Sequence, residues 1–167
     1  MLIGHLPAGY LLTRALMKKY KIPLNHWWLG LGLLFSIAPD FDHIFNLLFQ
    51  NNIYNHRLLP THVPLTYLII LLIGLLIYRI KPWLWLKWGM IIALPNLILH
   101  LILDTPFVGI KWLWPFYPKL VGIYNVNITA GIIVPNYYHY WYWYLEIILW
   151  LAAVITVIKS YKKGELN

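Results

Sequence analysis

Residues 83–104 read WLWLKWGMIIALPNLILHLILD, and this stretch decides the fold class that the sequence predicts. A helix rises ~1.5 Å per residue, so a helix of this length covers the ~30 Å hydrocarbon core of a bilayer. Two further apolar stretches have comparable length, residues 62–80 and residues 138–158. We therefore expect three long membrane-spanning helices, the last of which carries Glu146 as a hydrogen-bond partner inside the helix packing.

Two shorter apolar stretches, residues 2–17 and 24–38, precede these three. Each of them could span a locally thinned bilayer, or the two could form a re-entrant pair. The prediction is thus an all-α integral membrane helical bundle of about five helices, a single domain over residues 1–167. Composition agrees, because only 11% of the residues are charged, whereas soluble proteins have about 25%. The chain has no cysteine, which excludes disulfides and thiolate metal ligands.

Basic residues are distributed unevenly along these segments. The chain has 13 Lys and Arg against 5 Asp and Glu, and the cations lie beside apolar runs, so we expect membrane lipids rather than nucleic acid as partners. With five spans, Arg57, Lys111 and Lys119 fall on one face. The opposite face collects ten cations, namely Arg14, Lys18, Lys19, Lys21, Arg79, Lys81, Lys87, Lys159, Lys162 and Lys163. Positive charge marks the cytoplasmic side, which predicts a multi-pass inner-membrane protein with a cytoplasmic C-terminus.

Aspartates and histidines gather on the other, extracytoplasmic face. Asp40, Asp42 and His43 come from the motif PDFDH. The structural alternative to a functional site is that this motif only starts a helix beside a solvated loop. His100 and Asp104 are spaced i, i+4, which places them on one helix face. Ionisable groups within an apolar run are costly, so they indicate a functional site, although a structural His–Asp hydrogen bond would explain them too.

Three more candidates lie on the same face. His62 follows a helix entry at Pro60 and Thr61, and His5 lies near the start of the first helix. Arg57 could orient a substrate phosphate through its planar guanidinium or could contact a lipid headgroup. Imidazoles and carboxylates without thiolates favour a divalent metal, Zn²⁺ first and Mn²⁺ or Fe²⁺ next, with one or two ions. Such ions activate water for hydrolysis.

These motifs, in this order, resemble a known family. His5 with Gly9, PDFDH, the loop His56-Arg57 to Thr61-His62, HxxxD and a following Trp-Pro-Phe resemble the membrane-bound metal-dependent hydrolases over about residues 1–116. The resemblance implies metal residues at His5, Asp40, Asp42, His43, His62, His100 and Asp104. Their order is also similar to that of the zinc-dependent phospholipase C and single-strand nuclease superfamily. That similarity implies Asp40, His62, His100 and Asp104 around one ion and His5 at a second.

From these residues we expect a metal-dependent hydrolase that acts on a phosphoester bond, most readily that of a phospholipid. Asp40, Asp42 and Arg57 are the expected catalytic residues. The expected metal ligands are His5, Asp40, His43, His62, His100 and Asp104. A non-catalytic metal-binding or metal-transport protein uses the same ligands. A structural His–Asp network is a third interpretation, and it predicts no bound metal.

Overall fold

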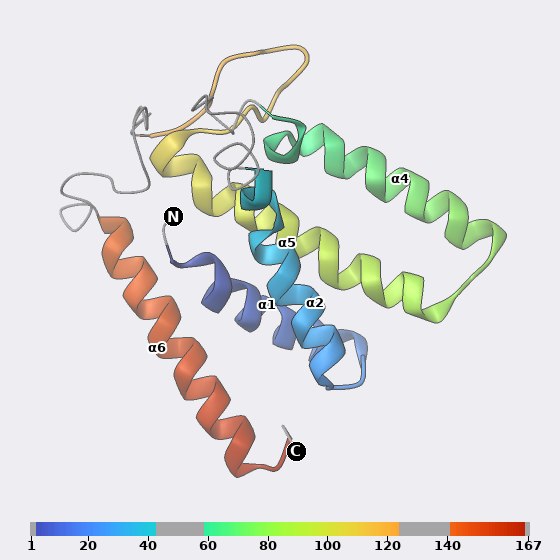
Figure 1. Cartoon of the computed structure of the whole chain (residues 1–167), viewed down its shortest axis with the longest axis vertical. Coiled ribbons are helices and arrows are strands. Elements are labelled where there is room, and N and C mark those ends of the chain that lie inside the picture. The colour runs from blue at the N-terminus through green and yellow to red at the C-terminus, as the bar shows by residue number, and fades with distance from the viewer. Residues whose placement is uncertain (1–2, 43–58, 124–140, 166–167) are drawn as a thin grey trace.

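The computed structural model describes residues 3–42, 59–123 and 141–165, and these residues are helical except for short connections and the longer non-helical stretch 109–123. A single β-bridge joins Ile110 and Val121. In chain order the helices of Figure 1 are α1 (His5–Tyr20), α2 (His26–Ile37), the 3₁₀ helices η1 (Ala38–Asp40) and η3 (Pro60–His62), α4 (Pro64–Ile80), α5 (Leu84–Val108) and α6 (Trp141–Lys162). The expected class of about five α-helices is therefore confirmed within the described part of the chain.

The expectation of three long spans needs a correction. Among the described residues, two helices are long and apolar enough to cross a membrane, Leu84–Pro106 and Trp141–Lys162, whereas Pro64–Ile80 has only 17 residues. The stretch 62–80 is shortened because Val63 is extended, with φ −112° and ψ 118°. A residue that precedes a proline is disfavoured in the helical region, so α4 begins only at Pro64.

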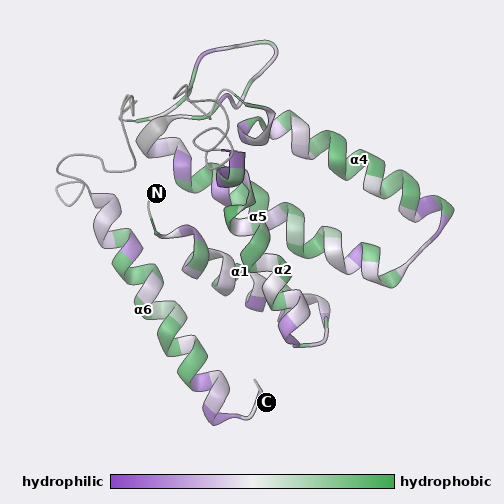
Figure 2. Cartoon of the chain, viewed as in Figure 1, coloured by the Kyte–Doolittle hydropathy of each residue, from purple (hydrophilic) through white to green (hydrophobic). Residues whose placement is uncertain are grey.

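Helices α4 and α6 are apolar along much of their length (Figure 2). Many of their large apolar side chains are exposed. Leu76 is 63% exposed, Ile80 is 85% exposed and Ile148 is 60% exposed. Apolar surface of this extent marks contact with a membrane or with another protein.

Helices α1 and α2 pack antiparallel at two glycines. A Cβ added at Gly9 would overlap the side chain of Ser36, and a Cβ at Gly32 would overlap Thr13. Small residues at such crossings let two helix backbones approach closely. Helix α5 packs against both, and its buried Asn96 donates from Nδ2 to Thr13 Oγ1 at 3.0 Å.

This arrangement brings one end of each of several helices together. The start of α1 and the ends of α2 and α5 meet, because His5 lies near Asp104 and Ser36 lies near His100. Helix α4 approaches the same end through Tyr67, which packs with Leu97 and Leu101 of α5. Side chains from distant stretches of sequence therefore converge at one end of the bundle.

Candidate metal centre

Helix α5 contributes two neighbouring side chains to this end of the bundle. His100 and Asp104 are each 1% exposed, and His100 Nε2 lies 3.7 Å from Asp104 Oδ2. Their spacing of one helical turn places both on the face of α5 that packs toward α1 and α2. An imidazole and a carboxylate are thus buried side by side.

Asp40 enters from η1, directly after α2. Pro39 stands in the first turn of this 3₁₀ helix, where its fixed φ and missing N–H are tolerated, and it is buried. Asp40 Oδ1 lies 3.5 Å from His100 Nε2. Its side chain is 40% exposed, in contrast to the buried His100 and Asp104. The carboxylate of Asp40 therefore lies at the side of the cluster that solvent reaches.

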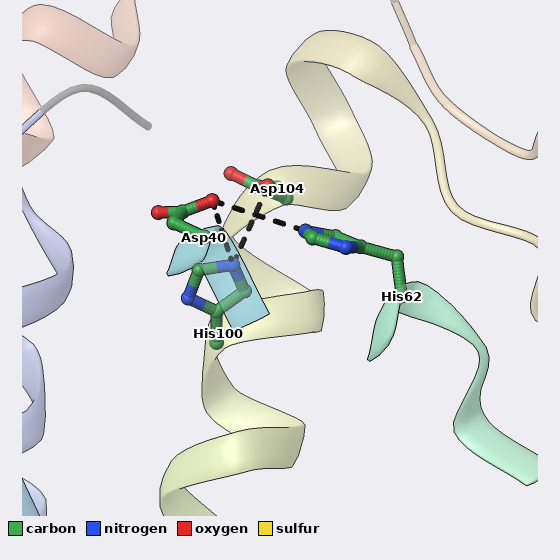
Figure 3. A group of neighbouring side chains, drawn as sticks. All are labelled: Asp40, His62, His100 and Asp104. Atoms are coloured by element: carbon green, nitrogen blue, oxygen red, sulfur yellow. Dashed lines mark ion pairs between the residues drawn. The ribbon is translucent and has the colours of Figure 1, made fainter. Parts of the chain in front are cut away.

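His62 enters from η3, between Pro60 and the start of α4. Its side chain is fully buried, and its Nε2 lies 3.8 Å from Asp40 Oδ1. Figure 3 shows the side chains of Asp40, His62, His100 and Asp104 directed toward one another. One ligand atom from each lies within 4.8 Å of every other, so this cluster could hold a metal ion.

The separations within the cluster are longer than hydrogen bonds and longer than those between the ligands of a bound zinc ion. The three ion-pair distances of 3.5, 3.7 and 3.8 Å exceed those of good hydrogen bonds. Ligands at 2.0–2.1 Å from a tetrahedral zinc ion are about 3.3 Å apart. The cluster is therefore slightly wider than a closed tetrahedral site, and small side-chain movements would close it around an ion.

The tautomer of His100 is determined by its other ring nitrogen. His100 Nδ1 lies 2.8 Å from the carbonyl oxygen of Ser36 on α2. Because a carbonyl only accepts, Nδ1 donates to it, and Nε2 is the ring nitrogen that faces Asp40. Metal-binding histidines are commonly oriented by such a bond from the second nitrogen.

His62 is supported in a similar way by a carboxylate. Asp42 Oδ2 lies 3.4 Å from His62 Nδ1, and the Thr61 hydroxyl donates to the same Asp42 oxygen. The Tyr67 hydroxyl in turn donates to the carbonyl of Thr61. Asp42 thus lies behind His62, on the side of the ring away from Asp40, and orients the imidazole from there.

His5 flanks the cluster from α1. Its Nε2 lies 3.4 Å from Asp104 Oδ1, while the other oxygen of Asp104 faces His100. The rings of His5 and His100 stack with centroids 4.0 Å apart. Asp104 therefore stands between two imidazoles, one inside the four-residue cluster and one beside it.

Charge interactions shift the pKa values of the two cluster residues that lie outside the long helices. Burial raises the pKa of the Asp40 carboxyl, but pairing with His100 and His62 outweighs burial and the pKa lies below its ordinary value. Burial lowers the pKa of His62, but the carboxylates of Asp40 and Asp42 outweigh it and the pKa lies above its ordinary value. The metal-free cluster thus favours an ionised Asp40 and a protonated His62.

Not every sequence-predicted site residue falls within the described part of the chain. The structure brings Asp40, His62, His100 and Asp104 together, with His5 beside them and Asp42 behind His62. His43 and Arg57 lie outside the described residues.

Sequence reasoning missed the role of Ser36, because it acts through its backbone carbonyl and no side-chain pattern reports a carbonyl. It placed Thr61 only at a helix entry, whereas the Thr61 hydroxyl holds Asp42. The sequence feature that could have indicated this role is the position of Thr61 directly before the candidate ligand His62.

Comparison with known proteins gives a family. The model of the YdjM inner membrane protein family matches residues 1–166, so the chain belongs to that family. No curated protein matches the chain, and no solved structure does either.

Proposed function

We propose that this member of the YdjM inner membrane protein family is a membrane-embedded, divalent-metal-dependent hydrolase that acts on a phosphoester bond of a lipid. Asp40, His62, His100 and Asp104 are the proposed ligands of one ion, with Zn²⁺ preferred over Mn²⁺ and Fe²⁺. His5 is the proposed ligand of a second ion, because its Nε2 faces Asp104 Oδ1, the carboxylate oxygen that does not face His100.

The observation that carries this proposal is the convergence of four donor atoms from η1, η3 and α5 within 4.8 Å. Burial of such a group in an apolar bundle is costly unless a cation or protons compensate the carboxylates. The donor set of two imidazoles and two carboxylates fits zinc. The bond from His100 Nδ1 to Ser36 leaves Nε2 as the donor that a metal needs.

A divalent ion held by Asp40, His62, His100 and Asp104 would supply acidified water and would stabilise negative charge on a phosphoryl oxygen. Three residues of the chain have further proposed roles. Asp40 is the exposed member of the cluster, so substrate approaches from its side, and its ionised carboxylate can accept a proton from the attacking water. Asp42 keeps the ring of His62 in place. Arg57 remains the proposed phosphate clamp.

A lipid substrate is proposed from the position of the cluster in the bundle. The cluster lies where α1 and α4 begin and α2 and α5 end, so it faces one boundary of the bilayer in a five-span arrangement. The last turns of α1, α4 and α6, at the opposite end, carry basic residues. The positive-inside rule then places the cluster on the extracytoplasmic side, within reach of lipid headgroups.

Metal analysis of the purified protein tests the site. We expect bound zinc in the wild type and its loss in His100→Ala and Asp104→Ala. His26→Ala is the matched control, because His26 is an exposed histidine at the start of α2, far along the helix from Ser36. Equal metal content in all four proteins would remove the metal centre and leave the structural His–Asp network as the explanation.

Activity is tested separately, with a panel of phospholipids and phosphodiesters. The zinc-loaded wild type is expected to hydrolyse at least one of them. Asp40→Asn is expected to lower the rate by at least about 10²-fold, because it removes both a proposed metal ligand and the proposed proton acceptor. Tight metal binding without hydrolysis of any member of the panel would favour the alternative, a metal-binding or metal-transport protein.

A further inference from the structure

A second site is suggested by a cavity at the opposite end of the bundle, between α1 and α6. These two helices run parallel, since Ile3 and Gly4 contact Glu146 near one end and Arg14 contacts Ser160 near the other. The cavity has a volume of about 550 Å³. It shares no residue with the metal centre.

Positive charge dominates the wall of this cavity. Four of its lining residues are cationic, namely Arg14, Lys18, Lys159 and Lys163. Glu165 is the one carboxylate among the described residues that line the cavity. The excess of positive charge points to an anionic ligand.

Arg14 stands at the centre of the hydrogen bonds around the cavity. Its Nη2 donates to Ser160 Oγ at 2.6 Å and to Glu165 Oε2 at 2.7 Å. Its Nη1 is buried and has no hydrogen-bond partner within the described residues. The side chain is only 15% exposed, so packing holds the guanidinium in place. A guanidinium held in this way, whose Nη2 is paired with Glu165 at the cavity, is suited to a charge-assisted hydrogen bond with a phosphate group that replaces this carboxylate.

The remaining lining residues are apolar, which favours an amphipathic ligand over a free inorganic ion. Leu11, Met17, Ile22 and Leu24 line the same cavity as the cations. On α6, Val157 and Ile158 are 41% and 49% exposed. They line a neighbouring apolar cavity together with Ala153 and Val154. An inorganic phosphate would gain nothing from these apolar contacts, whereas a lipid would.

We propose that this cavity binds the phosphate headgroup of an anionic phospholipid from the leaflet at the basic end of the bundle. Basic pockets between membrane helices on the cytoplasmic side are suited to such headgroups. Glu165 occupies one donor of Arg14 in the lipid-free protein, so the headgroup displaces the Glu165 carboxylate when it binds. This lipid is bound without being hydrolysed, and it is distinct from the substrate proposed for the metal centre.

Lipid titration of the full-length, delipidated protein in detergent micelles tests the proposal. The probes are phosphatidylglycerol, phosphatidylcholine and inorganic phosphate, and binding is read from the shift in thermal unfolding midpoint. We expect phosphatidylglycerol to bind, and phosphatidylcholine and inorganic phosphate to bind much more weakly. Lys18→Gln and Lys163→Gln should each weaken phosphatidylglycerol binding about fivefold, since one cation near a headgroup contributes about 1 kcal/mol.

Two further variants make the test specific. Lys162→Gln removes the same charge beside Lys163 but outside the cavity lining, and it should leave binding unchanged. Glu165→Gln should strengthen binding, because it frees Arg14 from a competing carboxylate.

Several outcomes would overturn the proposal. Equal losses in Lys162→Gln and Lys163→Gln would show attraction to the general surface charge only. Inorganic phosphate binding as tightly as phosphatidylglycerol would make this a site for soluble phosphate. Phosphatidylcholine binding as tightly as phosphatidylglycerol would exclude recognition of headgroup charge.

Discussion

At the scale of single residues, the candidate site depends on which atom of each side chain faces the cluster. His100 presents Nε2 because Nδ1 donates to Ser36, and His62 presents Nε2 because Asp42 lies at its Nδ1. The two imidazoles are thus held by a carbonyl and by a carboxylate. Partners of this kind raise the basicity of a ligand and prevent ring rotation.

Asp42→Asn is expected to weaken metal binding by about 10–100-fold, the range for loss of a group that orients a metal-binding histidine. The substitution keeps the shape of the side chain but removes the negative charge behind His62. Competition with a chromophoric chelator measures the affinity. Glu165→Gln, which removes a carboxylate at the other end of the bundle, should leave the affinity unchanged. An unchanged affinity in Asp42→Asn would show that Asp42 has no role in orienting His62.

Metal affinity is also expected to depend on pH. The pKa of His62 in the metal-free protein lies above its ordinary value, because Asp40 and Asp42 outweigh the effect of burial. A proton on His62 excludes the cation, so affinity should increase as pH rises through this pKa and should fall below it. Calorimetry in buffers of different ionisation enthalpy would detect the released proton. Affinity that stays constant from about pH 6 to 8 would contradict this, because an imidazole ligand titrates near that range.

At the scale of helices, two contacts position the elements that carry the ligands. The crossing of α1 and α2 at Gly9 and Gly32 brings Ser36 within reach of His100. Glu146 of α6 accepts hydrogen bonds from the backbone N–H groups of Ile3 and Gly4, at 3.1 and 3.2 Å, just before His5. The prediction that Glu146 serves as a hydrogen-bond partner is confirmed. Helix α6 thereby holds the start of α1, and with it His5, against the bundle.

Gly9→Ala is expected to destabilise the protein by about 1–3 kcal/mol, the usual range for overpacking a close contact. The added Cβ would overlap the Ser36 side chain, so α1 and α2 must separate. Thermal unfolding in detergent measures the effect. Gly30→Ala is the matched control on α2, because a Cβ there meets nothing within 4 Å. Equal midpoints for the two variants would show that the helices do not require the close approach at Gly9.

At the scale of the whole molecule, the two ends of the bundle differ in chemistry. One end holds the cluster of Asp40, His62, His100 and Asp104. The last turns of α1, α4 and α6 at the other end carry Lys18, Lys19, Arg79, Lys159 and Lys162. This polarity follows from the alternating direction of successive helices, and it underlies both the proposed orientation and the proposed lipid site.

Cysteine labelling tests the orientation directly, because the chain has no cysteine of its own. Lys119→Cys and Lys162→Cys place single thiols at exposed positions on the two faces. A membrane-impermeant maleimide added from the extracytoplasmic side should label Lys119→Cys, and it should label Lys162→Cys only after the membrane is permeabilised. The reverse pattern would place the metal centre on the cytoplasmic side.

Hydropathy and residue spacing were sufficient to predict the helical class, the approximate helix positions and the pairing of His100 with Asp104, because these depend on neighbours within about one helical turn. The length of α4 was not predicted, since Pro60 and Pro64 together shift its start. Which imidazole Asp40 and Asp42 each contact was decided by tertiary packing. It depends on where η3 lies against η1 and on how closely α1, α2 and α5 approach, and both are set by contacts between residues far apart in the chain.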